Sequence, residues 1–388
     1  MTMYEKALQL QQETAAHRRY LHSHAEAGLD LPMARDYVMQ TLRSYGLDPK
    51  LCGHGVTATL GSGGKCILLR ADMDALPMAE ESGESFASTT DAAHTCGHDF
   101  HAAMLLTAAK LLKEQEAELP GRVKFMFQPA EETFQGAKDM IENGILEDVD
   151  AALAFHVTSG RMPLGLYMYN NTGTMMASVD GFRIHIQGKG AHGAYPQNSI
   201  DPINIAVHTY LALEALIARE ADPEKMCVLT VGKFQAGTAP NIIPETATLE
   251  GTIRTNDPEN REKLVRRMKE TADLTAKVYG GSATVTMTSG VAPLICDKAL
   301  TTELVGYMDG LGVPGSFGYA GVTANASEDF ASVAENVPAC FMHLSAGFPD
   351  ERGDWPLHNP KVLFNEDVLP TGAAAYAHCA MQWLKNHQ

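Results

Sequence analysis

The stretch CILLRADMDALP (residues 66–77) sets the fold class of this chain. It is a continuous apolar run that turns acidic at its end, which is typical of a strand buried on both faces of a parallel sheet. RVKFMFQP (122–129) and ALAFHV (152–157) repeat this pattern, and apolar positions at helical spacing in 99–113 separate the first two runs. This alternation predicts an α/β fold with a doubly wound mixed sheet and helices on both faces.

The pattern changes near residue 175, where shorter alternating segments begin. The elements then follow the order strand, helix, strand, strand, helix, strand, which is typical of a ferredoxin-like α+β fold. The expected strands cover 180–192, 227–237, 245–255 and 282–288, and the expected helices cover 202–220 and 260–280. We therefore predict a domain over 177–291 that interrupts a discontinuous catalytic domain over 1–176 and 292–388.

Length and charge narrow the functions that the chain can have. Its 388 residues suit two domains better than one core. Thirty basic and 47 acidic residues give a net charge of −17, which repels nucleic acid and anionic lipid, so neither is an expected partner.

The sequence shows no signal peptide, no membrane span and no disulfide pattern. The N-terminal segment has no apolar core of a signal peptide, and no window reaches the roughly 20 apolar residues of a membrane span. Seven scattered cysteines are typical of free thiols in a reducing compartment. These features predict a cytoplasmic protein that neither enters nor crosses a membrane.

HTCGHDFHAA (94–103) is the first segment with residues that can bind a metal. Cys96 and His98 precede a helix across a glycine, so both can face one concave site, and a helix N-terminus lowers the pKa of a thiol. The alternative is a buried thiol beside a helix-capping histidine. Spacing alone also leaves His94 and His101 open as ligands.

Carboxylates end two of the expected strands. Glu131 and Glu132 follow a buried strand, where two adjacent charges raise each other's pKa unless one binds a metal and the other takes a proton from water. The alternative is a solvated pair on a loop. Asp74, near the end of the apolar run at 66–77, is expected to orient a ligand histidine. Asp72, next to it, is a candidate partner of Arg70 or a turn residue.

Two further histidines complete the candidate set. His156 ends a buried strand, and His358 lies between two prolines in PLHNP. Either alone is more often structural than a ligand. Several strands, however, deliver ionisable groups to the same end of one sheet, which indicates a functional site. Thiolate, imidazole and carboxylate together suit a transition metal better than magnesium or calcium.

The inserted domain carries three polar candidates. His192, between glycines, and Asn241, after a proline, are placed on turns where they can reach a substrate oxyanion. Arg254 can bind a carboxylate with two hydrogen bonds. Their alternatives are a loop histidine, an Asx-turn and a surface arginine.

Together these motifs occur in one order along nearly the whole chain: RADMDALP, CGHD, FQPAEE, GAH–YP, APNIIP, GTIR, SEDF and LHNP–F–VLPTGA. In this the chain resembles the metal-dependent aminoacylase and carboxypeptidase-type metallopeptidase family. The resemblance is to its subgroup of hippurate hydrolases, indole-acetyl-amino-acid hydrolases and N-acetyl-diaminopimelate deacetylases. It implies a catalytic domain broken by a lid and dimerisation domain, and hence a homodimer.

The resemblance also implies a binuclear centre of manganese or zinc, with cobalt or nickel as further candidates. Its implied ligands are Cys96 as the bridge, His98 and Glu132 at one metal, and His156 and His358 at the other. Glu131 matches the family's catalytic base. His192, Asn241 and Arg254 match residues that bind the substrate carbonyl or carboxylate, some of them across a dimer interface.

The implied activity is hydrolysis of the amide bond of N-acyl amino acids, such as hippurate or N-acetyl amino acids, to a carboxylic acid and a free amino acid. A dipeptidase or aminopeptidase with the same metal centre is the second substrate class. Two rival hypotheses are a cysteine amidase that uses Cys96 as nucleophile and a non-catalytic binding module. Phe100 and Ala102 depart from the family's usual Gly-His-Thr, and the segment after His156 lacks its tryptophan–proline run. The acyl group therefore stays unassigned.

Overall fold

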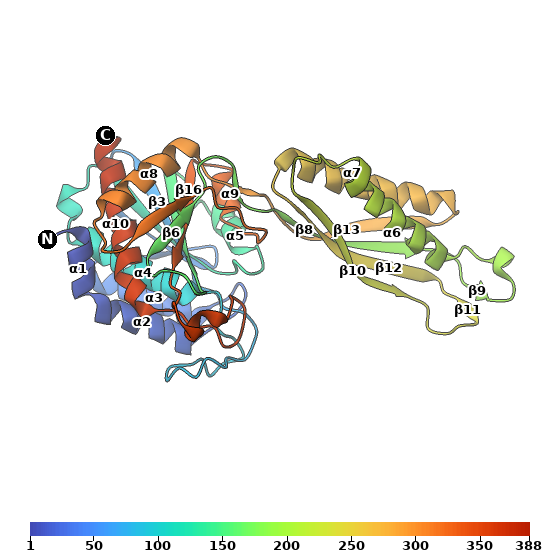
Figure 1. Ribbon diagram of the computed structural model, residues 1–388, viewed down its shortest axis with the longest axis horizontal. Coiled ribbons are helices and arrows are strands. Elements are labelled where there is room, and N and C mark those ends of the chain that lie inside the picture. The colour runs from blue at the N-terminus through green and yellow to red at the C-terminus, as the bar shows by residue number, and fades with distance from the viewer. The chain divides into compact units, whose positions relative to one another are not determined.

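Eight strands form the main sheet of the computed structural model, which describes residues 1–388. In spatial order they are β1 (Lys50–Cys52), β2 (Gly55–Gly61), β4 (Arg122–Gln128), β3 (Cys66–Asp72), β5 (Ala151–Thr158), β16 (Ala339–Ser345), β6 (Leu166–Tyr169) and β15 (Phe317–Ala320). The central strands β4, β3, β5 and β16 pair in parallel, whereas β1–β2, β2–β4 and β16–β6 pair antiparallel. The predicted mixed sheet is confirmed (Figure 1).

Helices cover both faces of this sheet. One face contacts α4 (His98–Lys113), α8 (Lys298–Gly310) and α10 (Leu369–Asn386), and α1 (Met3–Gln9), α2 (Gln11–Ser23) and α3 (Pro32–Ser44) add an outer layer there. The short helices α5 (Gly136–Glu142) and α9 (Ala331–Ala334) contact β4, β16 and each other, and their buried residues lie outside the main core cluster. The helical layers that the alternating pattern predicted are therefore present.

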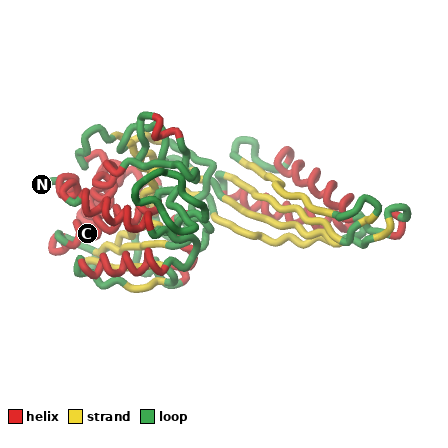
Figure 2. Tube along the Cα trace, turned by 90° about the horizontal axis from the view of Figure 1, so that it is seen from below, coloured by secondary structure: helices red, strands yellow, loops and turns green.

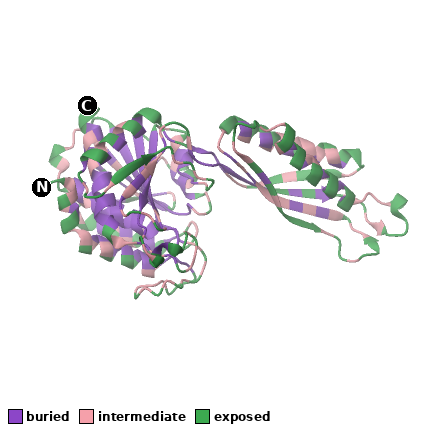
Figure 3. Ribbon diagram, in the orientation of Figure 1, coloured by how far each residue is buried: buried purple, intermediate pink, exposed green.

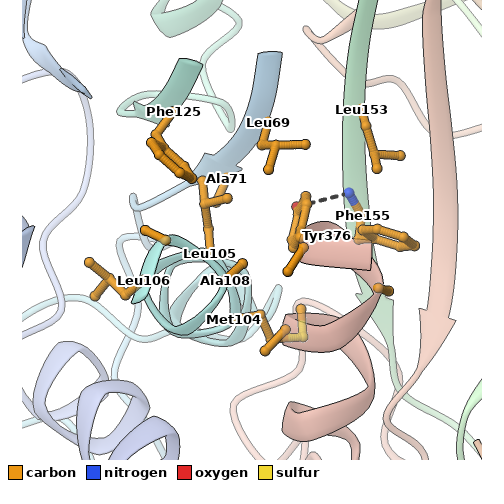
Figure 4. Packing of buried hydrophobic residues seen from close by; sticks show 14 of the residues in the cluster. Leu69, Ala71, Met104, Leu105, Leu106, Ala108, Phe125, Leu153, Phe155 and Tyr376 are labelled. Carbon is orange, nitrogen blue, oxygen red and sulfur yellow. Dashed lines mark hydrogen bonds between the residues drawn. The ribbon is translucent and has the colours of Figure 1, made fainter. Parts of the chain in front are cut away.

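Alternation along the strands separates an apolar face from a polar one. Leu69, Phe125 and Phe155 point toward α4 and α10, as Figure 4 shows, and each such buried side chain contributes about 1.5–3 kcal/mol. The Tyr376 hydroxyl of α10 accepts the N–H of Phe155 and donates to the carbonyl of Arg70. The intervening strand positions point to the opposite face, and among them are Arg70, Asp72 and His156.

The second sheet has four antiparallel strands in the order β10 (Cys227–Ala236), β12 (Thr246–Thr255), β8 (Val179–Gln187) and β13 (Ser282–Val291). Helices α6 (Pro202–Arg219) and α7 (Pro258–Val278) pack on one face of it, where they share a core with the inward side chains of β8 and β12 (Figure 2). The chain order is strand, helix, strand, strand, helix, strand, the ferredoxin-like order.

The chain divides into two compact units, each with its own buried core (Figure 3). The first comprises Met1–Met175, Ile295–Val322 and Asp329–Gln388, and the second comprises Met176–Leu294 and Thr323–Glu328. Two further pairs of short strands are β7 (Thr174–Met176) with β14 (Leu294–Ile295), and β9 (Ala191–His192) with β11 (Ile242–Ile243). No helix combines the length and the apolar character that crossing a bilayer needs.

Candidate metal centre

The carboxyl ends of β3, β4 and β5 and the start of α4 bring the candidate ligands together. Their ligand atoms form overlapping groups in which all atoms lie within 4.8 Å of one another. These groups are Cys96 with His98 and His156, Cys96 with Glu132 and His358, and His98 with Glu131 and Glu132. Residues that are far apart in the sequence therefore surround one point, and Cys96 belongs to two of the groups.

The separations fit ligands that share a cation. Cys96 Sγ lies 3.4 Å from His156 Nε2 and 3.3 Å from His358 Nε2. Glu132 Oε1 lies 3.5 Å from His358 Nε2 and 3.9 Å from His98 Nε2. Ligand atoms held at 2.0–2.3 Å by one tetrahedral zinc lie roughly 3.3–3.8 Å apart. Three of the four separations fall within this range, and the one between Glu132 and His98 lies just above it, so the donor set fits shared cations.

Hydrogen bonds on the far side of two imidazoles orient their lone pairs. His98 Nδ1 donates to the carbonyl of Asp74 at 2.9 Å, and His156 Nδ1 donates to the carbonyl of Val157 at 2.6 Å. Because a carbonyl oxygen only accepts, the proton sits on Nδ1 and each Nε2 presents a lone pair to the centre. His98 Nε2 and Glu132 Oε1 are buried without a hydrogen-bond partner. Buried polar atoms are rarely left in this state, and cations satisfy both.

The centre concentrates negative charge. Burial raises the pKa of the Cys96 thiol well above its usual range. Burial opposes charge on His98, but Asp72, Cys96 and Asp74 outweigh it and raise the pKa of His98. A bound cation lowers the pKa of the Cys96 thiol again, because it stabilises the thiolate directly. Sulfur, nitrogen and carboxylate donors fit a transition metal, so the residues present suit the metals that the sequence predicts.

Asp74 contacts two of the candidate ligands. Its Oδ2 accepts the backbone N–H of Glu132 at 3.1 Å, and its Oδ1 lies 3.3 Å from His98 Nδ1. Asp74 is buried, so these contacts are shielded from water. The carboxylate therefore holds the backbone of Glu132 and lies next to the His98 ring, which the Asp74 carbonyl orients.

Both nitrogens of His101, which the sequence left open as a ligand, are engaged elsewhere. Its Nε2 accepts the backbone N–H of Val157 at 2.7 Å, and its Nδ1 donates to Asp72. His101 therefore ties α4 to β5 beside His156 and offers no lone pair to a metal. His94, the other open histidine, belongs to none of the candidate metal groups.

Asp72 is the partner of Arg70, one of the roles considered for it. Arg70 Nη1 donates to Asp72 Oδ2 at 2.7 Å, and both side chains are buried. Burial by itself raises the pKa of Asp72, but Arg70, His98 and His101 together hold that pKa well below its usual range. The carboxylate thus stays charged beneath the centre and links Arg70 to the two histidines of α4.

Backbone conformations with positive φ orient the loops that carry the candidate ligands. Gly97 has φ +89°, and a Cβ there would lie 2.4 Å from Val157 Cγ2, so only glycine fits between Cys96 and His98. Ala130 (φ 52°) and His358 (φ 64°) adopt left-handed conformations that non-glycine residues rarely take. Such strain clusters at functional sites, where the surrounding structure holds it.

A histidine that the motifs do not include lies beside the centre. His343 in β16 pairs in register with His156 in β5, and their ring centroids are 5.8 Å apart. Burial lowers the pKa of His343 to about 4. The sequence could have pointed to His343, because it is a histidine within the apolar segment ACFMHLS (339–345). Its position beside His156 becomes known only from the strand pairing.

The three candidates of the second unit do not meet within one chain. His192 and Asn241 are exposed neighbours, because β9 pairs with β11 and Gly193 N donates to the carbonyl of Asn241 at 2.9 Å. Arg254 lies near the other end of β12 and is half-buried, with Nη1 buried and without a partner. At about 3.4 Å per residue, the eight steps from Thr246 to Arg254 span roughly 27 Å.

Comparison with known proteins extends this description. Residues 68–382 match the model of Peptidase family M20/M25/M40. The chain is 35% identical over 371 residues to an N-acetyl-L-cysteine deacetylase of Bacillus subtilis (strain 168), covering 93% of this chain and 85% of the relative. It is 36% identical over 377 residues to an IAA-amino acid hydrolase of Arabidopsis thaliana, covering 95% and 84%.

A solved structure shares both the fold and part of the sequence. It is a dinuclear metal-binding peptidase of the M20 family from Bacillus subtilis, which superposes with a TM-score of 0.82 at 29% identity. The match covers 97% of this chain and 99% of that one. Similarity therefore extends through both compact units.

Proposed function

Because the chain belongs to peptidase family M20/M25/M40, we propose that it is a two-metal amidohydrolase of N-acyl amino acids. Its products are a carboxylic acid and a free amino acid. The observation that carries this proposal is the cluster around Cys96, in which lone pairs of His98 and Glu132 are buried without hydrogen-bond partners. The relatives named as an N-acetyl-L-cysteine deacetylase and an IAA-amino acid hydrolase support the substrate class.

The proposed ligands divide between two divalent cations, manganese or zinc. Cys96 is shared, His98 and Glu132 complete one site, and His156 and His358 complete the other. When bound, the cations act as Lewis acids on the amide carbonyl and make water acidic enough to ionise near neutral pH. The carbonyls of Asp74 and Val157 hold the two imidazoles in the tautomer that such binding needs.

Glu131 is the proposed general base. It is buried at the end of β4, and its Oε2 lies 3.9 Å from His98 Nε2, so it stands beside the ligands. In the proposed reaction it takes a proton from the attacking water and returns it to the leaving amine. His192, with Asn241, stabilises the oxyanion, and Arg254 binds the carboxylate of the amino acid.

We infer that these groups act in a homodimer through the second unit. The roughly 27 Å along β12 between the His192 end and Arg254 exceeds a small substrate, so within one copy they serve different active sites. α6 presents an apolar stripe for the contact, with Ile203 (38% exposed), Val207 (44%), Tyr210 (37%) and Leu211 (57%) at helical spacing. β10 is an edge strand, which leaves its outer backbone groups free to pair with a second copy.

Charge and cysteine chemistry support the remaining expectations. A net charge of −17 opposes binding to nucleic acid or anionic membranes. All seven cysteines are free thiols, which supports a reducing, cytoplasmic location. The proposed partners are therefore the N-acyl amino acid and a second copy of the chain.

Chelation tests the proposal. The purified chain is assayed with hippurate, N-acetyl amino acids, N-acetyl-diaminopimelate and dipeptides, before and after EDTA treatment, and again after addition of Mn²⁺ or Zn²⁺. We expect N-acyl amino acids to be hydrolysed, activity to disappear on chelation, and added metal to restore it. Full activity in EDTA together with inactivation by iodoacetamide would instead indicate a cysteine amidase. Burial of Cys96 and its raised pKa argue against that enzyme, since a reactive thiol needs access and a low pKa.

A peptidase is the second candidate. The observation in its favour is the structural match to a dinuclear metal-binding peptidase. The same substrate panel separates the two functions, because a dipeptidase or aminopeptidase hydrolyses substrates with a free α-amino group and spares N-acetyl and N-benzoyl amino acids. Preference for dipeptides by more than about tenfold in kcat/KM, or 1.4 kcal/mol, would favour the peptidase.

A further inference from the structure

Four side chains form a row across the main sheet, starting at the metal centre. His156 of β5, His343 of β16, Met168 of β6 and Tyr319 of β15 stand opposite one another in register. Residues paired in this way emerge on the same face as close neighbours. His156 is 6% exposed, His343 is 8% exposed, and Tyr319 at the sheet edge is 62% exposed. The row therefore leads from the candidate ligand His156 to solvent.

His343 points to the face of the sheet that bears the site. Its neighbours Met342 and Leu344 belong to the main core on the opposite face. Phe341, two residues away, packs edge-on against the His343 ring with centroids 5.3 Å apart. His343 is thus held between Phe341 and His156.

The hydrogen bonding of His343 differs from that of His17 and His101, two other buried histidines of this unit. His17 contacts the hydroxyls of Tyr37 and Tyr45 with its two nitrogens, and both nitrogens of His101 are also bonded. In contrast, His343 Nδ1 is buried without any partner, as are His94 Nδ1 and, at the metal centre, His98 Nε2. His343 belongs to none of the candidate metal groups. Buried polar atoms are rarely left in this state, and a ligand bound beside His156 would complete the hydrogen bonds of His343.

We propose that His343 contacts the acyl half of the substrate and selects acyl groups that carry a hydrogen-bonding substituent, such as a hydroxyl or an amide. This rests on the proposed function, in which the lid groups bind the carboxylate of the amino-acid half. The acyl half is then left to the first unit, where His343 is the polar side chain next to His156 in the row. An imidazole can donate or accept, so its unpartnered nitrogen suits either substituent.

Matched substrates test this role. N-butyryl-methionine and N-(3-hydroxybutyryl)-methionine differ by one hydroxyl, and kcat and KM are measured for both with the metal-loaded enzyme. We expect the wild type to favour the hydroxylated substrate by about tenfold in kcat/KM. His343→Phe should abolish that preference, mainly through a higher KM for the hydroxylated substrate. His343→Gln, which keeps hydrogen-bonding groups, should retain part of it.

The controls distinguish direct contact of His343 with the substrate from a role in packing against His156. His54→Gln changes an exposed histidine outside the row and should leave the ratio between the two substrates unchanged. Metal content and melting temperature of each variant show whether the centre is intact. If His343→Phe lowers kcat/KM equally for both substrates, His343 acts only by packing against His156 and the proposal is overturned.

Failure of the proposed function gives a different result. In that case the metal-loaded wild type hydrolyses neither hippurate nor N-acetyl amino acids, so no acyl preference exists to be measured. A wild type that hydrolyses these substrates but shows no hydroxyl preference keeps the proposed function and overturns the role of His343.

Discussion

The two compact units hold their candidate residues in different ways. In the first unit, His98 and His156 are buried, and each is oriented by a carbonyl behind its ring. In the second unit, His192 and Asn241 are exposed on a two-residue strand pair. The first set is therefore ordered before a ligand arrives, because burial and hydrogen bonds restrict it. The second set is open to solvent, so substitutions there should affect the ordered centre of the first unit less than substitutions within that centre.

The largest effect is expected at Glu131. Glu131→Ala removes the proposed base but none of the proposed ligands, so kcat should fall by about 10²–10⁴-fold while metal content stays unchanged. Steady-state kinetics with an N-acetyl amino acid and elemental analysis of the purified variant measure both quantities. Turnover within tenfold of the wild type would remove Glu131 from this role.

Mixing two inactive variants tests whether the second unit acts on a partner's site. In a mixed dimer of Glu131→Gln and His192→Ala chains, action across the interface leaves one active site with both groups intact. Random assortment should then restore about a quarter of wild-type activity. If His192 acts within its own chain, both sites of every dimer are defective. Mixtures prepared by unfolding and refolding the two chains together, assayed beside each variant alone, distinguish the cases.

Asp74 should give a smaller effect, on metal binding. Asp74→Ala releases the backbone of Glu132 and removes a carboxylate next to His98 Nδ1. Residues that orient ligands typically change metal affinity by about 10–100-fold. Competition with a fluorescent chelator measures the affinity, and His192→Ala serves as the control from the second unit that should leave it unchanged. Equal affinities for Asp74→Ala and the wild type would contradict the orienting role.

The extent to which sequence predicts this molecule depends on the kind of contact. The buried run at 66–77 predicts β3, which the structure ends at Asp72. Because the ends of parallel strands share one edge, the meeting of His156 with Cys96 followed from the strand order. Strands β6 and β15 were not predicted, because they are short and Phe317–Ala320 is exposed throughout, without an apolar period.

Contacts that depend on how strands and helices are aligned with one another cannot be predicted from the sequence pattern. His101 accepts a hydrogen bond from the backbone of Val157, 56 positions along the chain, and no periodicity encodes that pairing. His343 likewise gains its place beside His156 only through the pairing of β16 with β5. In the second unit, the pattern placed His192, Asn241 and Arg254 on turns and strands, but the length of β12 between them decided which could share a site.

The smallest expected effect concerns stability, and it contrasts the two units directly. His101→Ala leaves the Val157 N–H and one Asp72 oxygen without their partner in a buried region, which should lower the free energy of unfolding by about 1–3 kcal/mol. His192→Ala removes an exposed ring and should change it by less than about 0.5 kcal/mol.

Far-UV circular dichroism during urea unfolding of the metal-free chain reports on both units, and tryptophan fluorescence isolates the first unit, because both tryptophans, Trp355 and Trp383, lie in it. His101→Gln, whose amide can accept the Val157 N–H, should recover part of the loss. Equal midpoints for His101→Ala and the wild type would mean that His101 contributes nothing to the ordering of the first unit. The greater order attributed to the metal centre would then have to come from Asp74 and the carbonyl contacts alone.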